Sequence, residues 1–223
     1  MLTFIILTKI ILTLTKAILA KYKGQVAYTL NMNNLDVLAI GYLIRDETGK
    51  ILQAHSTSTL IRTDDRLIVV DTSSKEMRPA LKIAFKQIGV FAKDVDTVVL
   101  THNHNDHTAN CDMFPNAKVL IHSGEDNPRR GAEIVEGDMS LAKGIELRHT
   151  PGHSWDSMSV FVEGPDRKYV IAGDAIPLED NYRKNVPPAL HVCKDLAMKS
   201  IKTISDYADV IVPGHGGPFK IKG

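Results

Sequence analysis

The chain has 223 residues, of which 43% are hydrophobic and 24% charged, and its formal net charge is +1. This length and composition are typical of one soluble α/β domain, and the small net charge gives no argument for a nucleic-acid or anionic-membrane partner. The two cysteines, Cys111 and Cys193, match no zinc motif and no disulfide framework. We therefore interpret them as reduced thiols of a cytoplasmic protein.

Residues 1–34 form an apolar extension ahead of the predicted domain. Met1 to Ala20 is rich in Leu, Ile and Thr, but Lys9 and Lys16 interrupt it, so no apolar run approaches the ~20 residues of a membrane span. No basic region precedes it and no small-residue cleavage site follows, as a signal peptide would require. We predict a helix or strand that packs on the domain or on a second copy of the chain and does not cross a membrane.

Strand and turn patterns follow the extension in chain order. Apolar runs predict strands over 37–44, near 51, and over 58–61, 67–70 and 95–100, with turns at 46–49 and 63–65. Helical spacing of apolar residues predicts one helix that ends at Gly89, with Ala80, Leu81, Ala84, Phe85 and Ile88 on its buried face. Short apolar runs predict three more strands, over 145–147, 169–172 and 210–212. Residues 35–223 are therefore predicted to form one α/β domain.

The strand over 95–100 leads directly into a dense group of potential metal ligands. Residues two apart on a strand point the same way, so His102 and His104 can face one point as the chain leaves the sheet. Asp106 and His107 then turn back toward a second point close by. Imidazole nitrogen and carboxylate oxygen are typical ligands of a divalent ion such as zinc. The stretch therefore predicts a metal site, since an ordinary surface loop rarely holds so many ligands.

Each of the three later strands also leads to a potential ligand. The strand over 145–147 precedes His153, the strand over 169–172 precedes Asp174, and the strand over 210–212 precedes His215. Ligand sites in α/β sheets gather at strand ends, where loops converge. We therefore expect these side chains to join the first group in one site.

The order of these motifs, HxHxDH, TPGH, GD and PGH, resembles the metallo-β-lactamase superfamily of hydrolases, from about Leu35 to the C-terminus. The resemblance implies a four-layer αββα sandwich with the active site at one edge between the sheets. It implies two metal ions, one bound by His102, His104 and His153 and the other by Asp106, His107 and His215, with Asp174 bridging them. Asp71 takes the place of the aspartate in the family's VDTG motif, beside the ligands, whereas Ser73 replaces the glycine of that motif.

The ligand set itself predicts a reaction type. Two divalent ions on a shared carboxylate, typically ~3.5–4 Å apart, hold a hydroxide between them and make it a nucleophile at neutral pH. Seven nitrogen and oxygen ligands exceed what one tetrahedral ion needs, so we predict two ions, zinc first, with iron or manganese as alternatives. Asp106 can also orient the hydroxide or accept its proton, which makes it the predicted catalytic residue.

The resemblance leaves the substrate open among small esters, lactones, thioesters and phosphoesters, and the sequence identifies no substrate-binding residue. The resemblance also leaves two other activities of the superfamily open: a mononuclear iron persulfide (sulfur) dioxygenase, and a small metal-dependent RNA nuclease. We predict surface or supporting positions for the histidines outside the motifs, His55, His122, His149 and His191. Trp155 is predicted to lie in the core or along the pocket, and the segment 176–188 is predicted to face the substrate.

Overall fold

The computed structural model describes residues 35–124 and 131–222. The apolar extension therefore lies outside the described residues, and its predicted packing on the domain or on a second chain stays a prediction. Within the described ranges, no helix is long and apolar enough to cross a membrane.

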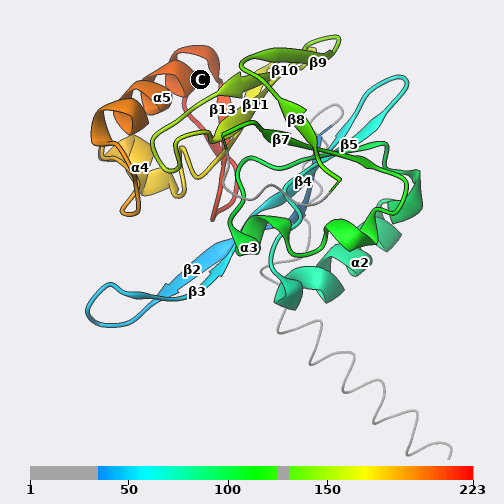
Figure 1. The fold of residues 1–223 in the computed structure, drawn as a ribbon, viewed down its shortest axis with the longest axis horizontal. Helices are drawn as coiled ribbons and strands as arrows, with labels where there is room; N and C mark the ends of the chain where they lie inside the picture. Colours follow the sequence, from blue (N-terminus) through cyan, green and yellow to red (C-terminus); the bar gives the residue numbers. More distant parts are fainter. Residues whose placement is uncertain (1–34, 125–130, 223) are drawn as a thin grey trace, which may run out of the picture.

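The first half of the domain forms one six-stranded sheet (Figure 1). Its strand order is β1-β4-β5-β6-β7-β8. Strands β5 to β8 run parallel to one another, and β1 and β4 add two antiparallel strands at one edge. The bounds of its strands are β1 Leu35–Ala39, β4 Ser58–Arg62, β5 Leu67–Val70, β6 Thr97–Val99, β7 Lys118–His122 and β8 Glu133–Val135.

The second half forms another six-stranded sheet, with the order β14-β13-β12-β11-β10-β9. Strands β12 and β13 are parallel, and the other neighbours are antiparallel. The bounds of its strands are β9 Met139–Ala142, β10 Ile145–His149, β11 Met158–Glu163, β12 Lys168–Gly173, β13 Val210–Pro213 and β14 Phe219–Lys220.

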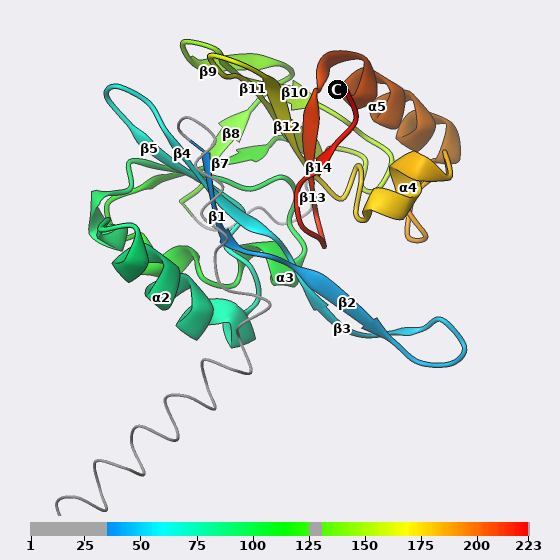
Figure 2. The ribbon, with the colours of Figure 1, turned by 180° about the vertical axis from the view of Figure 1, so that it is seen from behind.

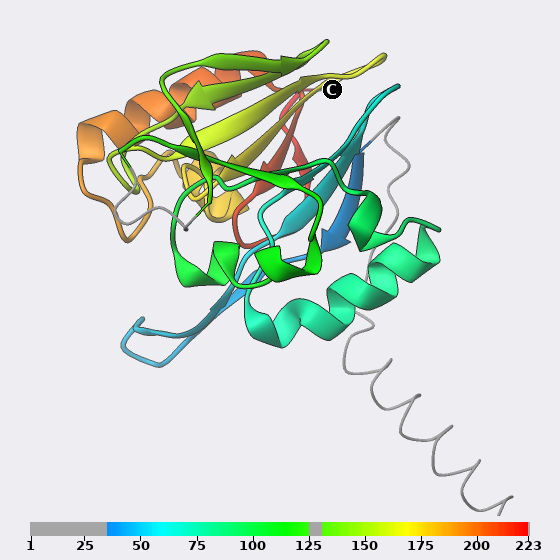
Figure 3. The same ribbon diagram turned by 45° about the vertical axis from the view of Figure 1, so that its right-hand side comes forward.

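The two sheets pack face to face, with helices on both outer faces (Figure 3). Side chains alternate between the faces of each strand: in β5, Ile68 and Val70 enter the core between the sheets, whereas Val69 packs under α2 (Arg78–Gln87). Helix α5 (Lys194–Tyr207) packs on the outer face of the second sheet. These layers confirm the predicted αββα sandwich.

Helix α2 confirms the predicted helix before Gly89. Its buried residues recur at helical spacing and leave the opposite face to solvent: Ala80, Leu81, Ala84 and Phe85. The shorter helical elements are α3 Asn105–Thr108, α4 Glu179–Arg183 and the single turns η1 Lys75–Met77, η2 Ala92–Asp94 and η3 Cys111–Met113.

The single strand predicted over 37–44 is wrong. Strand β1 ends at Ala39, and β2 (Tyr42–Arg45) pairs instead with β3 (Ile51–His55) in a hairpin that projects from the body of the domain (Figure 2). At Gly41, between the two strands, a Cβ atom would lie 2.3 Å from the carbonyl oxygen of His55. Glycine therefore permits the close backbone approach at which the chain leaves the sheet and enters the hairpin.

Candidate metal centre

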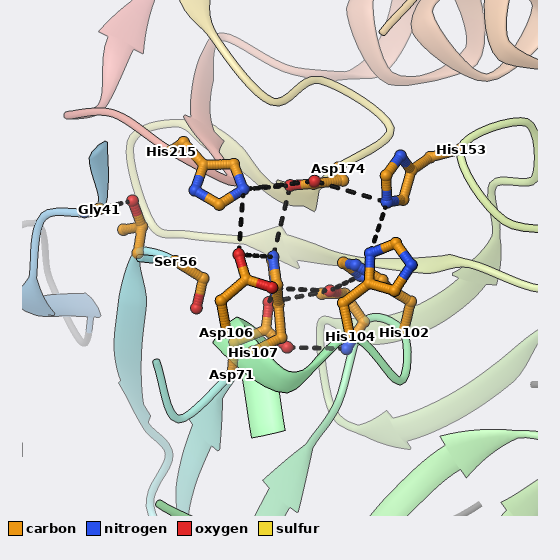
Figure 4. A network of polar contacts seen from close by, with 12 residues as sticks. Gly41, Ser56, Asp71, His102, His104, Asp106, His107, His153, Asp174 and His215 are labelled. Carbon is orange, nitrogen blue, oxygen red and sulfur yellow. Dashed lines mark hydrogen bonds and ion pairs between the residues drawn. The ribbon is translucent and has the colours of Figure 1, made fainter. Parts of the chain in front are cut away.

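The structure brings the seven predicted ligands together where the strand ends of both sheets meet (Figure 4). They form three overlapping groups whose nitrogen and oxygen atoms lie within 4.8 Å of one another: His102, His104 and His153; His102, His107 and Asp174; Asp106, His107 and His215. The side chains come from the loop after β6 and from α3, and from the loops that follow β10, β12 and β13.

His102, His104 and His153 form one end of the cluster. The Nε2 atom of His153 is 3.0 Å from Nδ1 of His104, while its Nδ1 atom donates a hydrogen bond to the Leu190 carbonyl oxygen at 2.8 Å. A carbonyl oxygen only accepts, so the proton of His153 lies on Nδ1 and the Nε2 lone pair faces His104. Two ring nitrogens at this separation suit a shared cation.

Asp106, His107 and His215 form the other end. The Nδ1 atom of His215 donates to the carbonyl oxygen of His55 at 2.9 Å, which directs its Nε2 lone pair into the cluster. The Oδ2 atom of Asp106 lies 3.6 Å from Nε2 of His215 and 3.8 Å from Nε2 of His107. These atoms face a common point.

Asp174 lies between the two ends. Its Oδ1 atom is 3.2 Å from Nε2 of His215 and 3.5 Å from Nε2 of His107, and its Oδ2 atom is 3.5 Å from Nε2 of His153. A Cβ atom at Gly214 would lie 2.0 Å from Oδ1 of Asp174. The chain therefore needs glycine there so that the backbone before His215 can pass so close to the carboxylate.

Three atoms of the cluster are buried and have no hydrogen-bond partner among residues 35–124 and 131–222: Nε2 of His102, Nε2 of His107 and Oδ1 of Asp174. Buried polar atoms in native proteins nearly always have a partner. Lone pairs of imidazole nitrogen and carboxylate oxygen that converge in this way are the ligand atoms of zinc and related ions. The donor set therefore fits divalent metal ions.

Asp71 lies beside the cluster and orients one of its histidines through hydrogen bonds. It accepts hydrogen bonds from the backbone N–H of Thr101 to Oδ1 and from the Thr101 hydroxyl to Oδ2, each at 2.8 Å. The Nδ1 atom of His107 donates to the same Oδ2 atom at 2.8 Å. Asp71 is 1% exposed, and it fixes the ring of His107 so that Nε2 points into the cluster.

The turn after Asp71 keeps a shape suited to glycine even though Ser73 stands at the glycine position of the motif. Asp71 and Ser73 both have positive φ angles, 54° and 57°. The Ser73 hydroxyl donates to the carbonyl oxygen of Ser56 at 2.7 Å, and the Asn110 amide nitrogen donates to the carbonyl oxygens of Thr72 and Ser74. These bonds stabilise the left-handed conformation, which is unfavourable for serine.

Burial and neighbouring charges shift the pKa values of three side chains of the cluster. Burial holds the pKa of His102 well below its usual value, and His107 lowers it further. Burial opposes the charged form of His107, but the Asp71 and Asp174 carboxylates raise its pKa well above the usual value. Burial likewise disfavours the charge on Asp174, yet His215 and His107 lower the pKa of that carboxyl well below its usual range.

We expect zinc binding at pH 7 to release a proton from His107. A histidine ligand must be neutral, whereas the raised pKa keeps His107 charged in the metal-free protein; His102 is already neutral and releases none. Zinc affinity should therefore rise from pH 6 to pH 8. Titration calorimetry in buffers of different ionisation enthalpy measures the release, and zinc uptake with no proton release would contradict this charge state.

Comparison with known proteins agrees with this geometry. Residues 53–126 match the family model described as the metallo-beta-lactamase superfamily. A probable metallo-hydrolase of Methanocaldococcus jannaschii is 37% identical over 183 residues, which cover 82% of this chain and 87% of the relative. The chain belongs to the metallo-β-lactamase superfamily. It is a metal-dependent hydrolase, in agreement with the prediction from its motifs.

Two further comparisons agree with this assignment, one in sequence and one in fold. An N-acyl homoserine lactonase of Bacillus cereus is 26% identical over 208 residues, which cover 82% of each protein. The structure of a putative metallo-β-lactamase of Thermotoga maritima superposes with a TM-score of 0.70 at 21% identity, over 84% of this chain and 99% of that one. The likeness to the Thermotoga maritima structure shows a common fold.

The sequence identified only part of the walls of the site. A cavity of about 200 Å³ opens onto the cluster, between the β2–β3 hairpin and the segment that follows Asp174. Its lining residues beyond the cluster are Leu43, Arg45, Ile51, Ala54, Pro177, Pro188, Ala189 and Leu190. The segment 176–188 thus reaches the cavity with its two ends, while its middle forms α4. Trp155 is 59% exposed and lies neither in the core nor along this cavity.

Two histidines outside the motifs, His122 and His149, contact each other away from the seven-residue cluster. The rings of His122 and His149 stack with their centroids 4.5 Å apart. Nδ1 of His122 is 3.1 Å from Oδ1 of Asp156, and Nε2 of His149 donates to the Trp155 carbonyl oxygen at 3.0 Å. Together with Asp156 they form a group whose nitrogen and oxygen atoms lie within 4.8 Å of one another. The group connects β7 and β10 to the loop after His153.

Proposed function

We propose that the protein hydrolyses a small ester or lactone with two divalent metal ions, zinc first. The observation that carries this proposal is the position of Asp174 between two ligand groups, within 3.5 Å of His107, His153 and His215. One group is His102, His104 and His153, and the other is Asp106, His107 and His215, the division that the resemblance of the motifs implies. When bound, two such ions supply a hydroxide nucleophile at neutral pH and polarise the carbonyl oxygen under attack.

The residues of the chain then have separate tasks. Asp174 holds the two ligand groups together, and Asp71 keeps His107 in the tautomer that presents Nε2 to the cluster. We assign to Asp106 the role of proton acceptor or orienting group, because its carboxylate is partly exposed at the cavity whereas Asp174 is enclosed.

The cavity favours a small acyl compound as substrate. At about 200 Å³ it is smaller than the roughly 300–1,000 Å³ of sites for drug-sized ligands. Its walls beyond the cluster are mostly apolar, which suits the hydrocarbon part of an acyl group. The lactonase name of the Bacillus cereus relative supports the same reaction class.

Metal analysis and a hydrolysis screen test the proposal together. We expect the active, fully loaded protein to contain two metal ions per chain. Chelation should abolish the hydrolysis of small esters and lactones, and addition of zinc should restore it. At most one metal ion per active chain would overturn the two-metal proposal. Consumption of oxygen with a persulfide, or metal-dependent cleavage of RNA without ester hydrolysis, would indicate the other two activities that the sequence leaves open.

A further inference from the structure

The face of the β2–β3 hairpin that lines the cavity consists of three apolar residues and one arginine. In the register of β2 and β3, Leu43 pairs with Ala54 and Arg45 pairs with Ile51, and these four residues line the cavity. The Leu43 and Ala54 pair lies next to the base of the hairpin, where the carbonyl oxygen of His55 accepts the hydrogen bond from His215. Arg45 lies two residues further out on β2, a step of ~7 Å along a strand.

Arg45 differs from the other arginines in the described part of the chain. Each of the others forms an ion pair with a carboxylate: Arg62 with Asp36, Arg66 with Asp65, Arg78 with Asp112, Arg148 with Glu146, Arg167 with Asp166 and Arg183 with Glu179. Among the described residues, Arg45 has no such partner. It donates to the carbonyl oxygen of Gly49 at 2.7 Å, which uses part of a fork of five N–H groups.

Neighbouring carboxylates do not neutralise Arg45. The side chain of Asp46, the next residue, accepts hydrogen bonds from Thr48 and from the backbone N–H of Lys50 within the hairpin turn. The carboxylates that line the same cavity, Asp106 and Asp174, belong to the proposed metal cluster. Arg45 is therefore an exposed positive charge with no carboxylate partner among the described residues, at the outer end of an apolar wall.

We propose that Arg45 selects substrates that carry an anionic group separated from the scissile carbonyl by a short hydrocarbon spacer. This inference rests on the proposed ester or lactone hydrolysis at the metal cluster. The carbonyl lies at the cluster, the spacer contacts Leu43 and Ala54, and the guanidinium of Arg45 binds a carboxylate through paired hydrogen bonds. Water cleaves the ester bond to give the acid and the alcohol, and Arg45 takes no part in that step.

Two six-carbon esters test the selection. The 4-nitrophenyl monoester of adipate carries a terminal carboxylate, and 4-nitrophenyl hexanoate is its neutral counterpart. With the zinc-loaded protein, we expect kcat/KM for the adipate ester to exceed that for the hexanoate ester by about tenfold, mainly through KM, as one charge-assisted pair provides. The Arg45→Gln variant should lose this preference, and Arg45→Lys should keep part of it.

Lys50→Gln is the matched control. Lys50 lies on the same hairpin and carries the same charge, but it is not among the residues that line the cavity, so its replacement should leave the preference unchanged. Equal kcat/KM values for the two esters in the wild-type protein, or a preference that survives in Arg45→Gln, would overturn the inference while the proposed hydrolysis stands.

A binding measurement separates the two proposals if neither ester is cleaved. Adipate and hexanoate each bring one carboxylate to the metal ions, and only adipate brings a second one for Arg45. Calorimetry on the zinc-loaded protein should show adipate binding about tenfold more tightly, with the difference lost in Arg45→Gln. Equal affinities would overturn the role of Arg45, whereas the expected difference without cleavage of any ester would contradict only the hydrolysis.

Discussion

The Asp174→Ala variant is expected to lose hydrolysis by at least about 10³-fold, at the upper end of the effect of single groups that stabilise charge in an active site. Asp174 contacts both ends of the cluster, since its carboxylate lies within 3.5 Å of His153, His107 and His215. Without it, the two ligand groups lose the side chain that holds them at one site. Metal content measured by mass spectrometry should fall below two ions per chain.

Two companion variants distinguish this role from simple misfolding. Asp174→Asn keeps the side-chain volume but removes the charge, so we expect a folded protein by circular dichroism with the same loss of activity. Asp180→Ala removes an exposed carboxylate of α4 whose partner is Lys184 and should leave turnover and metal content unchanged. Full activity with two bound ions in Asp174→Asn would show that the bridging role is wrong.

Much of the fold and the gathering of the predicted ligands followed from the sequence, because these residues lie directly after predicted strands. Short apolar runs predict β6, β10, β12 and β13, and each is followed closely by a histidine or aspartate of the cluster. The glycines near these residues permit close backbone approaches, as at Gly214 beside Asp174. Local patterns of this kind are readable because strand period and turn chemistry act over a few residues.

The surroundings of the cluster were less predictable because they depend on contacts distant in the chain. Residues 37–44 are apolar almost throughout, so the sequence pattern does not indicate that the strand ends within this run. The reason why β1 and β2 belong to different sheets is the close approach of Gly41 to the carbonyl oxygen of His55. The same carbonyl orients His215, 160 residues away. This contact uses a backbone oxygen, which every residue has, so no sequence pattern indicates it. The sequence could therefore predict only that the His55 side chain lies outside the ligand set.

The Asp71→Asn variant should reduce hydrolysis by about 10–100-fold or more, the usual effect of changing a residue that orients a metal ligand. The carboxylate of Asp71 accepts three hydrogen bonds, two from Thr101 and one from Nδ1 of His107. Asparagine replaces one acceptor oxygen by an NH₂ group. If that group faces His107, the ring must accept at Nδ1 and carry its proton on Nε2, the atom that should bind metal.

The backbone is not the cause of this expected loss, because asparagine tolerates the positive φ of 54° at position 71 better than most residues. Metal titration should therefore show a lower affinity for the ion held by Asp106, His107 and His215, and an unchanged affinity for the other ion. Asp65→Asn is the control: it changes an exposed aspartate in the turn at the opposite end of β5 and should leave both ions in place. An equal loss of affinity for both ions in Asp71→Asn would mean that Asp71 mainly stabilises the fold around the whole cluster. Orientation of His107 would then not be its main contribution.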